Sequence, residues 1–203
     1  MRIIGICGIS GSGKSYLIKR LKEKSPSRIS ILSTDDYYKK RESQLKDENG
    51  IENYDLPSSI EAYKLIKDIN SLKNGETISI NKYAFNLVGA TPKEEEIKPT
   101  EILLVEGIFV LAIEELKAHF HNTIFIQSDL QTVLEKRILR DVAERGMSKE
   151  EVLYQWENHV LPGYKEYVLP YEGIVDSLIH NDHETDAFVE EVYGGIMGGV
   201  NLL

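Results

Sequence analysis

The segment from Gly8 to Ser15, which reads GISGSGKS, constrains the fold of this chain more than any other stretch. It fits the pattern G-x-x-x-x-G-K-[ST] of a phosphate-binding loop, which lies between a buried strand and the amino end of a helix. The surroundings match this context, because the apolar run 2–7 precedes the loop and a helical pattern over about 14–24 follows it. A chance glycine turn is the alternative. The sequence therefore predicts an α/β fold built around a phosphate loop.

The residue types in this loop are those that a nucleotide triphosphate requires. Glycines allow successive backbone N–H groups to curl around phosphates, and the amino end of the helix adds a positive dipole. Lys14 can neutralise the β and γ phosphates, and the Ser15 hydroxyl can bind Mg²⁺. We expect ATP or GTP with Mg²⁺ as the cofactor. The candidate cofactor-binding residues of the loop are Gly8, Ser10, Gly11, Ser12, Gly13, Lys14 and Ser15.

Apolar runs alternate with helical patterns along most of the chain, which is typical of a parallel sheet with helices on both faces. A helical spacing of apolar residues covers 57–73, with Gly75 as a stop. The segment 76–99 differs, because it alternates between apolar and polar residues and is interrupted by Gly89 and Pro92. This pattern predicts an antiparallel hairpin. The strands predicted for the main sheet are 2–7, 28–33, 101–107, 122–128 and 176–180.

Two helices joined by a sharp turn are predicted between 129 and 167, and this shape is typical of a lid. Gly146 can end the first helix. Ser148 and Glu151 form a capping box that begins the second helix. An apolar stripe at four-residue intervals runs along the first helix, as on a helix face that packs against a core. The stripe is formed by Leu130, Leu134, Ile138 and Val142.

Length, composition and charge narrow the class of protein. With 203 residues and 41% hydrophobic content, the chain can bury one sizeable core, so we expect a single domain over 1–203. No apolar run approaches the roughly 20 residues that span a bilayer, and no signal-peptide cleavage pattern follows the apolar start. The single cysteine, Cys7, cannot form a disulfide within the chain, which favours the cytoplasm. A net charge of −9 argues against a general nucleic-acid surface.

Three acids follow predicted strands at the edge of the sheet where ligands bind in open α/β folds. Asp35 and Asp36 come just after the strand 28–33, and Glu106 ends the apolar run before Gly107. A carboxylate at Asp35 can accept a proton from an attacking hydroxyl or position Mg²⁺, as kinases require. A solvated turn is the alternative for both aspartates, and we favour it for Asp36. Glu106 is a candidate neighbour of the metal, and an acid facing solvent is its alternative.

Arginines in the first lid helix provide candidate phosphate ligands. Arg137 and Arg140 are three residues apart and share a helix face, so both can converge on a phosphate. Arg145 lies four residues after Asp141, so an ion pair within the helix is the alternative for Arg145.

The order of these motifs resembles the uridine kinase branch of the phosphate-loop nucleoside kinases, the group that also contains phosphoribulokinase and pantothenate kinase. The resemblance implies a P-loop NTPase-type parallel sheet of about five strands flanked by helices, with a substrate-side β-hairpin over about 76–99 and a helical lid over about 129–167. It also implies Mg²⁺-dependent transfer of the γ-phosphoryl group of ATP or GTP to the 5′-hydroxyl of a uridine-like or cytidine-like nucleoside. The segments that carry it are GISGSGKS, STDDYYK, NYDLPSSIEAY, ILLVEGIF, RILRDVAERG and YVLPYEGIVDSLI.

The resemblance implies roles for individual acids near the phosphate loop. Asp35 matches the family's catalytic base, which also lies near the metal, and it would act with Lys14 and Arg140. Asp55, in the segment NYDLP, matches the acid that grips the ribose hydroxyls. Ser15 and Glu106 match the metal neighbourhood.

The resemblance also implies roles for the lid and the hairpin. Arg137 matches a lid arginine that reaches the acceptor, whereas Arg140 and Arg145 match arginines near the triphosphate. Gln155 matches a lid residue that faces the nucleobase. Tyr83 and Phe85 match the aromatic residues of the family's hairpin motif.

Departures from the family pattern cluster at the base-reading end. The hairpin motif reads YAF, with Ala84 where the family has an acid, and the histidine expected a few residues later is missing from NLVGATP. Met147 stands where an arginine is usual. The acceptor is expected to be a small molecule, with nicotinamide riboside or a non-nucleoside alcohol as alternatives to uridine and cytidine. A nucleotide-binding regulatory protein without kinase activity is the alternative from another class, and relatives often form homo-oligomers.

Overall fold

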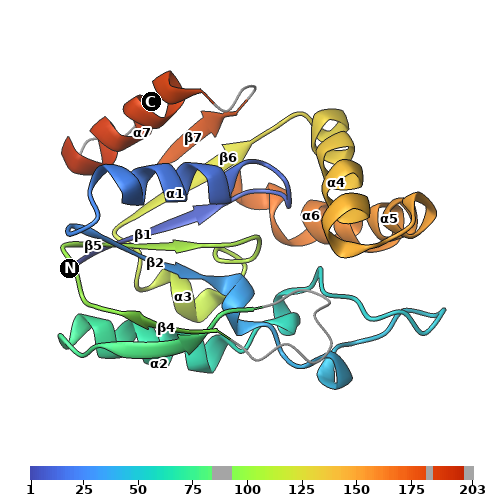
Figure 1. The fold of residues 1–203 in the computed structure, drawn as a ribbon, viewed down its shortest axis with the longest axis horizontal. Coiled ribbons are helices and arrows are strands. Elements are labelled where there is room, and N and C mark those ends of the chain that lie inside the picture. The colour runs from blue at the N-terminus through green and yellow to red at the C-terminus, as the bar shows by residue number, and fades with distance from the viewer. Residues whose placement is uncertain (84–92, 182–184, 199–203) are drawn as a thin grey trace.

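A parallel sheet with helices on both faces forms the centre of the molecule (Figure 1). The computed structural model describes residues 1–83, 93–181 and 185–198. Five parallel strands form the sheet in the order β2-β5-β1-β6-β7. This arrangement confirms the predicted sheet. The strands are β1 (Arg2–Cys7), β2 (Ile29–Ser33), β5 (Ile102–Glu106), β6 (Asn122–Gln127) and β7 (Ser177–His180).

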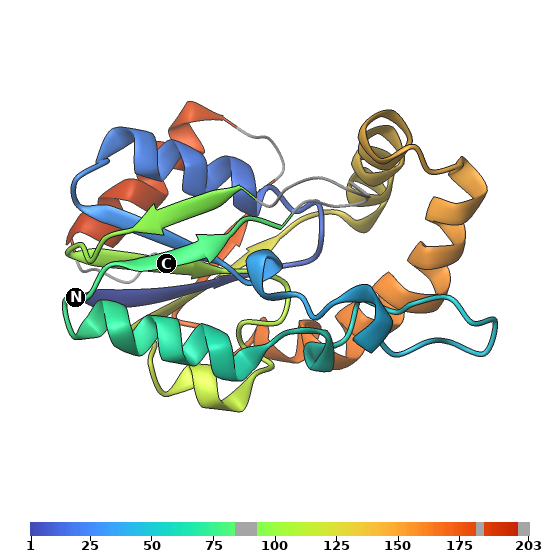
Figure 2. The same cartoon turned by 60° about the horizontal axis from the view of Figure 1, so that its bottom comes forward.

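The two faces of the sheet carry separate hydrophobic cores, because successive side chains of a strand point to opposite faces. Ile4 and Ile6 pack in the core with α1 (Lys14–Lys24) and α7 (Asp186–Gly198). Ile3 and Cys7 belong to the core on the other face, with α2 (Ala62–Lys73) and α3 (Glu114–Lys117). Figure 2 shows these helix pairs on opposite sides of the sheet. Burial on both faces explains why these strands read as unbroken apolar runs.

The predicted antiparallel hairpin is present as a separate two-stranded sheet, formed by β3 (Ile78–Asn81) and β4 (Glu94–Ile97). Ile78 and Ile80 alternate with exposed residues and pack into the core beside α2. Phe85 lies outside the described residues, as does the rest of 84–92.

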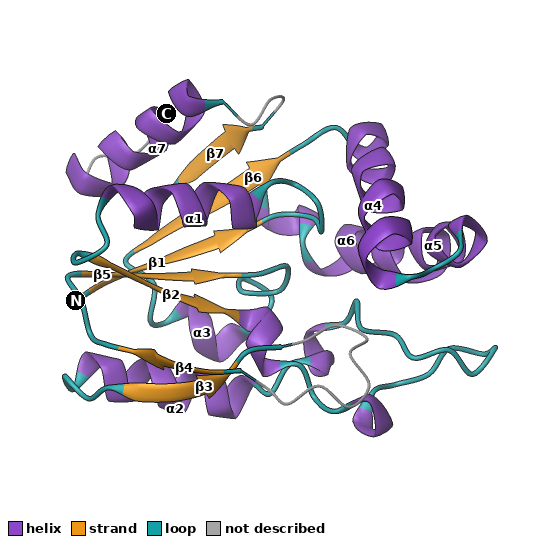
Figure 3. Ribbon diagram, viewed as in Figure 1, coloured by secondary structure: helices purple, strands orange, loops and turns teal. Residues whose placement is uncertain are grey.

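The lid segment consists of α4 (Leu130–Arg145), α5 (Lys149–Gln155), a π-helical turn (Trp156–Val160) and α6 (Leu161–Tyr167), and it projects beyond the sheet (Figure 3). Gly146 ends α4 in the left-handed conformation, with φ 67°. Ser148 and Glu151 make the predicted capping box at the start of α5. The predicted helix, sharp turn and second helix are therefore present, and the second helix contains a π-helical turn.

The buried face of α4 differs from the predicted apolar stripe. Leu130 is 36% exposed and Val142 is 43% exposed. The side chains buried along α4 are Val133, Arg137 and Asp141. Charged groups can occupy an inward face when they pair with each other, as they do here.

The segment 57–61 is not part of α2, contrary to the predicted start at Pro57. A 3₁₀ turn covers Pro57–Ser59, and Ile60 is extended and pairs with Tyr38. Because this bridge holds Ile60 in extended backbone, α2 begins only at Ala62. Further 3₁₀ turns are Thr34–Tyr37, Arg41–Ser43 and Leu169–Tyr171. Within the described residues, no helix combines the length and the apolar character that crossing a membrane requires.

Candidate active site

The phosphate loop joins β1 to α1, and its backbone favours glycine at three positions, of which Gly8 has φ 152°. Gly11 has φ 90° and Gly13 has φ 88°, in the left-handed region that favours glycine. Gly8 packs closely on β6, since a Cβ there would lie 2.4 Å from the Ile126 carbonyl oxygen. The predicted order of strand, glycine loop and helix is confirmed.

Lys14 lies buried at the centre of this loop, with 7% of the residue exposed. Its Nζ donates to the carbonyl oxygens of Gly8 at 2.8 Å and Ile9 at 2.9 Å. Burial lowers the pKa of Lys14, and the nearby carboxylates of Glu106 and Asp35 oppose this shift. The loop therefore holds a cation close to the two acids.

Asp35 and Glu106 are brought together by the register of neighbouring strands. Ser33, at the end of β2, is level with Glu106 in β5, and its Oγ donates to Glu106 Oε1 at 2.6 Å. Glu106 is 5% exposed, so the alternative of an acid facing solvent is wrong. Burial, followed by the charge of Asp35, raises the pKa of Glu106 to about 7.

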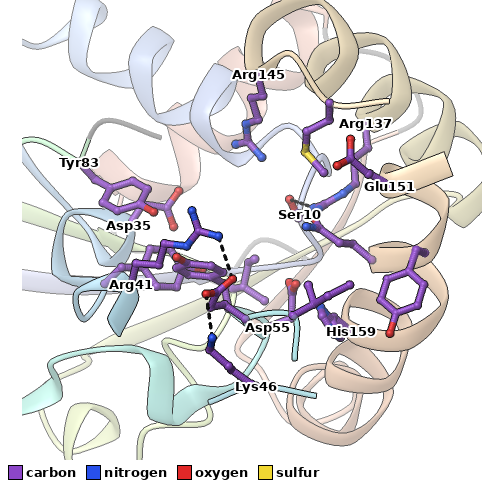
Figure 4. A pocket seen from close by; sticks show the side chains of 18 of the residues that line it. Ser10, Asp35, Arg41, Lys46, Asp55, Tyr83, Arg137, Arg145, Glu151 and His159 are labelled. Carbon is purple, nitrogen blue, oxygen red and sulfur yellow. Dashed lines mark hydrogen bonds and ion pairs between the residues drawn. The ribbon is translucent and has the colours of Figure 1, made fainter. Parts of the chain in front are cut away.

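The Asp35 side chain opens into a cavity, as Figure 4 shows. Surrounding protein displaces enough water to raise the pKa of Asp35, while the positive charge of Lys14 opposes the shift. Asp35 and Glu106 thus share one electrostatic neighbourhood with Lys14, in which the charge of Asp35 disfavours ionisation of Glu106 and the charge of Lys14 favours ionisation of both acids.

Asp36 is not the solvated turn acid that its sequence context suggested. Its side chain is 4% exposed and pairs with Lys82 Nζ at 2.5 Å. It also accepts a hydrogen bond from the Tyr83 amide at 2.9 Å. The chain after β3 passes over this turn, and Asp36 anchors it there.

A cavity of about 1040 Å³ lies next to the phosphate loop, between the turn after β2, the segment 41–55 and the lid (Figure 4). Predicted site residues from distant parts of the sequence meet on its walls: Ser10, Asp35, Asp55, Tyr83, Arg137, Arg145 and Gln155. Lys14, Ser15, Glu106 and Arg140 are not among its lining residues.

Asp55 is held in the cavity wall by close backbone packing. Its amide donates to Asn53 Oδ1 at 2.8 Å. Its carbonyl oxygen lies against α6, where a Cβ on Gly163 would come within 2.3 Å of it. Burial raises the pKa of Asp55, and the positive charge of Arg137 opposes this.

Arg137 links the lid to the phosphate loop. It is 6% exposed, and its Nη1 donates to Ser10 Oγ at 3.2 Å. Its Nη2 donates to Gln155 Oε1 at 3.4 Å. This arginine therefore contacts both the loop and the second lid helix.

Asp141 is a candidate site residue, although the sequence analysis named it only as an ion-pair partner of Arg145. It is fully buried and pairs with all three lid arginines. The predicted ion pair with Arg145 is present, with 3.1 Å between Arg145 Nη1 and Asp141 Oδ1, yet Arg145 also lines the cavity. The sequence did contain a signal, because Arg137, Arg140 and Arg145 lie four before, one before and four after Asp141.

The segment 41–55 was also missed as a wall of the cavity. Tyr38 contacts Tyr54, with 5.7 Å between ring centroids, and Tyr83, with 5.4 Å. These three rings form one aromatic surface of the cavity. Nothing in the alternation of the sequence indicated that this loop would fold back toward the lid.

The second lid helix also contacts this segment. Asp47 accepts hydrogen bonds from Tyr154 Oη and is paired with His159 Nε2, both at 2.8 Å. We call Asp47 with these two partners the Asp47 clasp.

Donor groups near the phosphate loop fit a nucleotide with Mg²⁺. Arg140 Nη2 and Ser12 Oγ are buried with no hydrogen-bond partner among the described residues, and phosphate oxygens would provide partners for both. Ser15, Asp35 and Glu106 offer the oxygen ligands that Mg²⁺ prefers. No cluster of three or more His, Cys, Asp or Glu side chains suited to a metal occurs within the described residues.

A model of the Phosphoribulokinase / Uridine kinase family matches residues 3–187. Uridine kinase of Chlamydia pneumoniae is 32% identical over 184 residues, covering 90% of this chain and 83% of the relative. Uridine-cytidine kinase B of Dictyostelium discoideum is 32% identical over 181 residues, covering 87% of this chain and 73% of the relative.

Two solved kinases share the fold. Phosphoribulokinase from Rhodobacter spheroides matches with a TM-score of 0.63 and 13% identity, over 92% of this chain and 73% of that structure. D-glycerate 3-kinase from Cryptococcus neoformans matches with a TM-score of 0.61 and 16% identity, over 81% of this chain and 78% of that structure. The phosphate loop, the acids at the strand ends and the family match agree: the chain belongs to the Phosphoribulokinase / Uridine kinase family and is an ATP-dependent phosphotransferase with an alcohol acceptor.

Proposed function

We propose that the protein transfers the γ-phosphoryl group of ATP or GTP to the 5′-hydroxyl of a nucleoside, with Mg²⁺ as the metal. One observation carries this proposal: Asp35, Asp55 and Arg137 line a single cavity that adjoins the phosphate loop. Relatives at 32% identity are named uridine kinase and uridine-cytidine kinase, which supports a nucleoside as the acceptor.

Asp35 is proposed to accept the proton of the attacking hydroxyl. Its place on the cavity wall supports this role, because a base must reach the acceptor. Lys14 and Arg140 hold the transferring phosphoryl group and stabilise its charge. Mg²⁺ bound near Ser15, Asp35 and Glu106 would neutralise charge on the β and γ oxygens. The remaining loop residues cradle the phosphates through backbone N–H groups.

The acceptor is proposed to bind between Asp55 and the aromatic surface of Tyr38, Tyr54 and Tyr83. A carboxylate such as Asp55 can accept hydrogen bonds from both hydroxyls of a ribose. Arg137 faces the acceptor, and Arg145 contributes at the triphosphate side. Gln155 and Tyr83 lie along the wall where a base would stack, and Phe85 stays a predicted contact.

A pyridinium riboside such as nicotinamide riboside is a second candidate acceptor, and one observation favours it over anionic alcohols. Six Asp or Glu side chains and four Lys or Arg side chains of the described residues line the cavity. An excess of carboxylates disfavours an acidic acceptor, whereas a cation over aromatic rings is attracted to them. Met147, the departure from the family pattern, also lines the cavity.

An acceptor screen tests the proposal. ADP release is measured with Mg²⁺ and ATP against uridine, cytidine, the other ribonucleosides, nicotinamide riboside and small alcohols. Turnover with at least one ribonucleoside supports the proposal. Turnover only with a non-nucleoside alcohol contradicts the nucleoside assignment, and nucleotide binding without transfer to any acceptor favours a regulatory protein.

The proposal also covers the domain organisation, the location and the oligomeric state of the protein. We propose one folding unit over 1–203, a cytoplasmic location and assembly into homo-oligomers. Limited proteolysis tests the single folding unit, cell fractionation tests the location, and sedimentation measures the oligomeric state.

A further inference from the structure

One carboxylate in the first lid helix gathers three guanidinium groups. Asp141 is 0% exposed, and its Oδ1 lies 2.7 Å from Arg140 Nε and 3.1 Å from Arg145 Nη1. Its Oδ2 lies 3.3 Å from Arg137 Nε. Three buried or half-buried cations thus share a single anion.

In Arg137 and Arg140, the contact with Asp141 leaves the Nη atoms available for other partners. Asp141 meets Arg137 and Arg140 through Nε, so the two Nη atoms of each guanidinium extend beyond the contact. Arg137 uses its Nη atoms to reach Ser10 and Gln155 (Figure 4). Arg140 Nη2 is buried without a hydrogen-bond partner among the described residues. Asp141 therefore holds the inner edge of Arg140 by a hydrogen bond and that of Arg137 by an ion pair, while the outer edges face other partners.

Two of the three arginines act electrostatically on the groups proposed to react. Arg140 influences the ionisation of both Lys14 and Asp35, and Arg145 influences that of Asp35. Burial and the charge of Arg140 lower the pKa of Arg145, and Asp141 opposes this shift. Without a central anion, three cations on adjacent helical turns would repel one another, and each long side chain could rotate away.

We propose that Asp141 is a positioning residue for phosphotransfer, which fixes the orientation of Arg137, Arg140 and Arg145 without touching a reacting atom. This inference rests on the proposed roles of the arginines at the acceptor and the triphosphate. Misplacement of catalytic groups by about 1 Å can reduce a rate by roughly 10²-fold, so a change in the orientation of the guanidiniums should slow phosphotransfer.

Charge and geometry make opposite predictions for Asp141→Asn, which makes this variant a sharp test. The substitution removes one negative charge beside three arginines, so charge alone would tighten the binding of an anion. Loss of positioning would instead weaken anion binding and slow turnover. We expect kcat to fall roughly 10²-fold and the affinity for tripolyphosphate to fall as well.

A matched control separates positioning from helix stability. Asp129 caps the amino end of the same helix through the Thr132 amide and lies eight residues before Arg137, so Asp129→Ala should destabilise α4 without disturbing the arginines. Thermal unfolding, kcat, both KM values and tripolyphosphate binding at low and high salt are measured for each variant. We expect Asp129→Ala to lower the melting temperature and keep kcat within about threefold of wild type.

Equal loss of kcat in both variants, or tighter tripolyphosphate binding with unchanged kcat in Asp141→Asn, would overturn the proposal. Should Asp141→Asn not fold, Asp141→Glu keeps the charge while shifting the carboxylate, and wild-type kcat in that variant would also overturn it. The binding measurement needs no acceptor. A failed acceptor screen with weakened tripolyphosphate binding would therefore contradict the proposed nucleoside acceptor while leaving the positioning role of Asp141 supported.

Discussion

At the residue scale, neighbours rather than residue type give each carboxylate its role. Asp35 and Asp36 are adjacent, yet Asp36 is occupied by Lys82 and the Tyr83 amide, whereas Asp35 opens into the cavity. Glu106 is buried beneath them and is held by Ser33. The same side-chain chemistry therefore serves as an anchor at Asp36, a proposed base at Asp35 and a proposed metal neighbour at Glu106.

Replacement of Asp35 by Asn should lower kcat by on the order of 10²-fold or more, because the amide cannot accept the acceptor's proton. Steady-state kinetics with the best acceptor from the screen provide the measurement. Asp36→Asn is the adjacent comparison, and we expect a smaller loss, since Asp36 acts through its contacts with the hairpin. Wild-type turnover in Asp35→Asn would show that this carboxylate is not the base.

At the element scale, the site is assembled by contacts between the lid and the segment 41–55. The Asp47 clasp joins this segment to the second lid helix through Tyr154 and His159. Close packing of α6 on Asp55, at Gly163, makes a second joint. His159 of the first joint lies in the π-helical turn, and Gly163 of the second joint lies three residues after that turn, in α6. The lid thereby positions the cavity wall at which the acceptor is proposed to bind, as well as the arginines.

The Asp47 clasp should make stability depend on pH in the acid range. Burial disfavours the charged form, but hydrogen bonds from the Ile51 amide, Tyr154 and His159 outweigh it and lower the pKa of Asp47 to about 2. Because the folded-state pKa lies below the ordinary value of 3.8, the stabilisation is present above about pH 4 and is lost as pH falls toward 2.

This dependence is measured by thermal unfolding of wild type and Asp47→Asn at intervals of about one pH unit between pH 2 and 6. The wild-type advantage in melting temperature should shrink as pH falls through this window. A constant difference across the whole range would contradict the assignment.

Substitution of Gly163 by Ala should raise the KM of the acceptor, because the new Cβ would lie 2.3 Å from the Asp55 carbonyl oxygen and must displace it. The KM of ATP should stay close to the wild-type value. Gly173→Ala is the matched control, since a Cβ there meets nothing within 4 Å. An acceptor KM equal to that of the control would mean that the position of Asp55 does not govern acceptor binding.

Local sequence patterns were enough to predict the helices and strands. Which side chains of α4 are buried depends on tertiary contacts and could not be predicted in this way. The glycine loop, the five parallel strands and the capping box at Ser148 each depend on nearby residues, and each was predicted. The apolar stripe through Leu130 and Val142 was misleading, because ion pairing with Asp141 buries Arg137 in its place. The walls of the cavity come from segments far apart in the sequence, and only resemblance to a family placed Asp55 and Gln155 among them.

At the scale of the whole molecule, the fold brings its reactive groups to one edge of one sheet. The phosphate loop follows β1, Asp35 follows β2 and Glu106 ends β5, all at the carboxyl edge. The lid begins just after β6 at the same edge (Figure 1). Two packed cores support this edge from both faces of the sheet. Parallel topology therefore gathers the proposed nucleotide and acceptor sites at one edge, where open α/β folds bind ligands.

The central claim is phosphoryl transfer to a 5′-hydroxyl, and a matched pair of acceptors tests it most directly. ADP formation with ATP and Mg²⁺ is measured with the best ribonucleoside and with its 5′-deoxy analogue, alongside a reaction without acceptor. We expect rapid ADP formation with the ribonucleoside, and with the analogue only the rate of the acceptor-free reaction. Equal rates with both acceptors, or no rate above that background with any ribonucleoside, would contradict it.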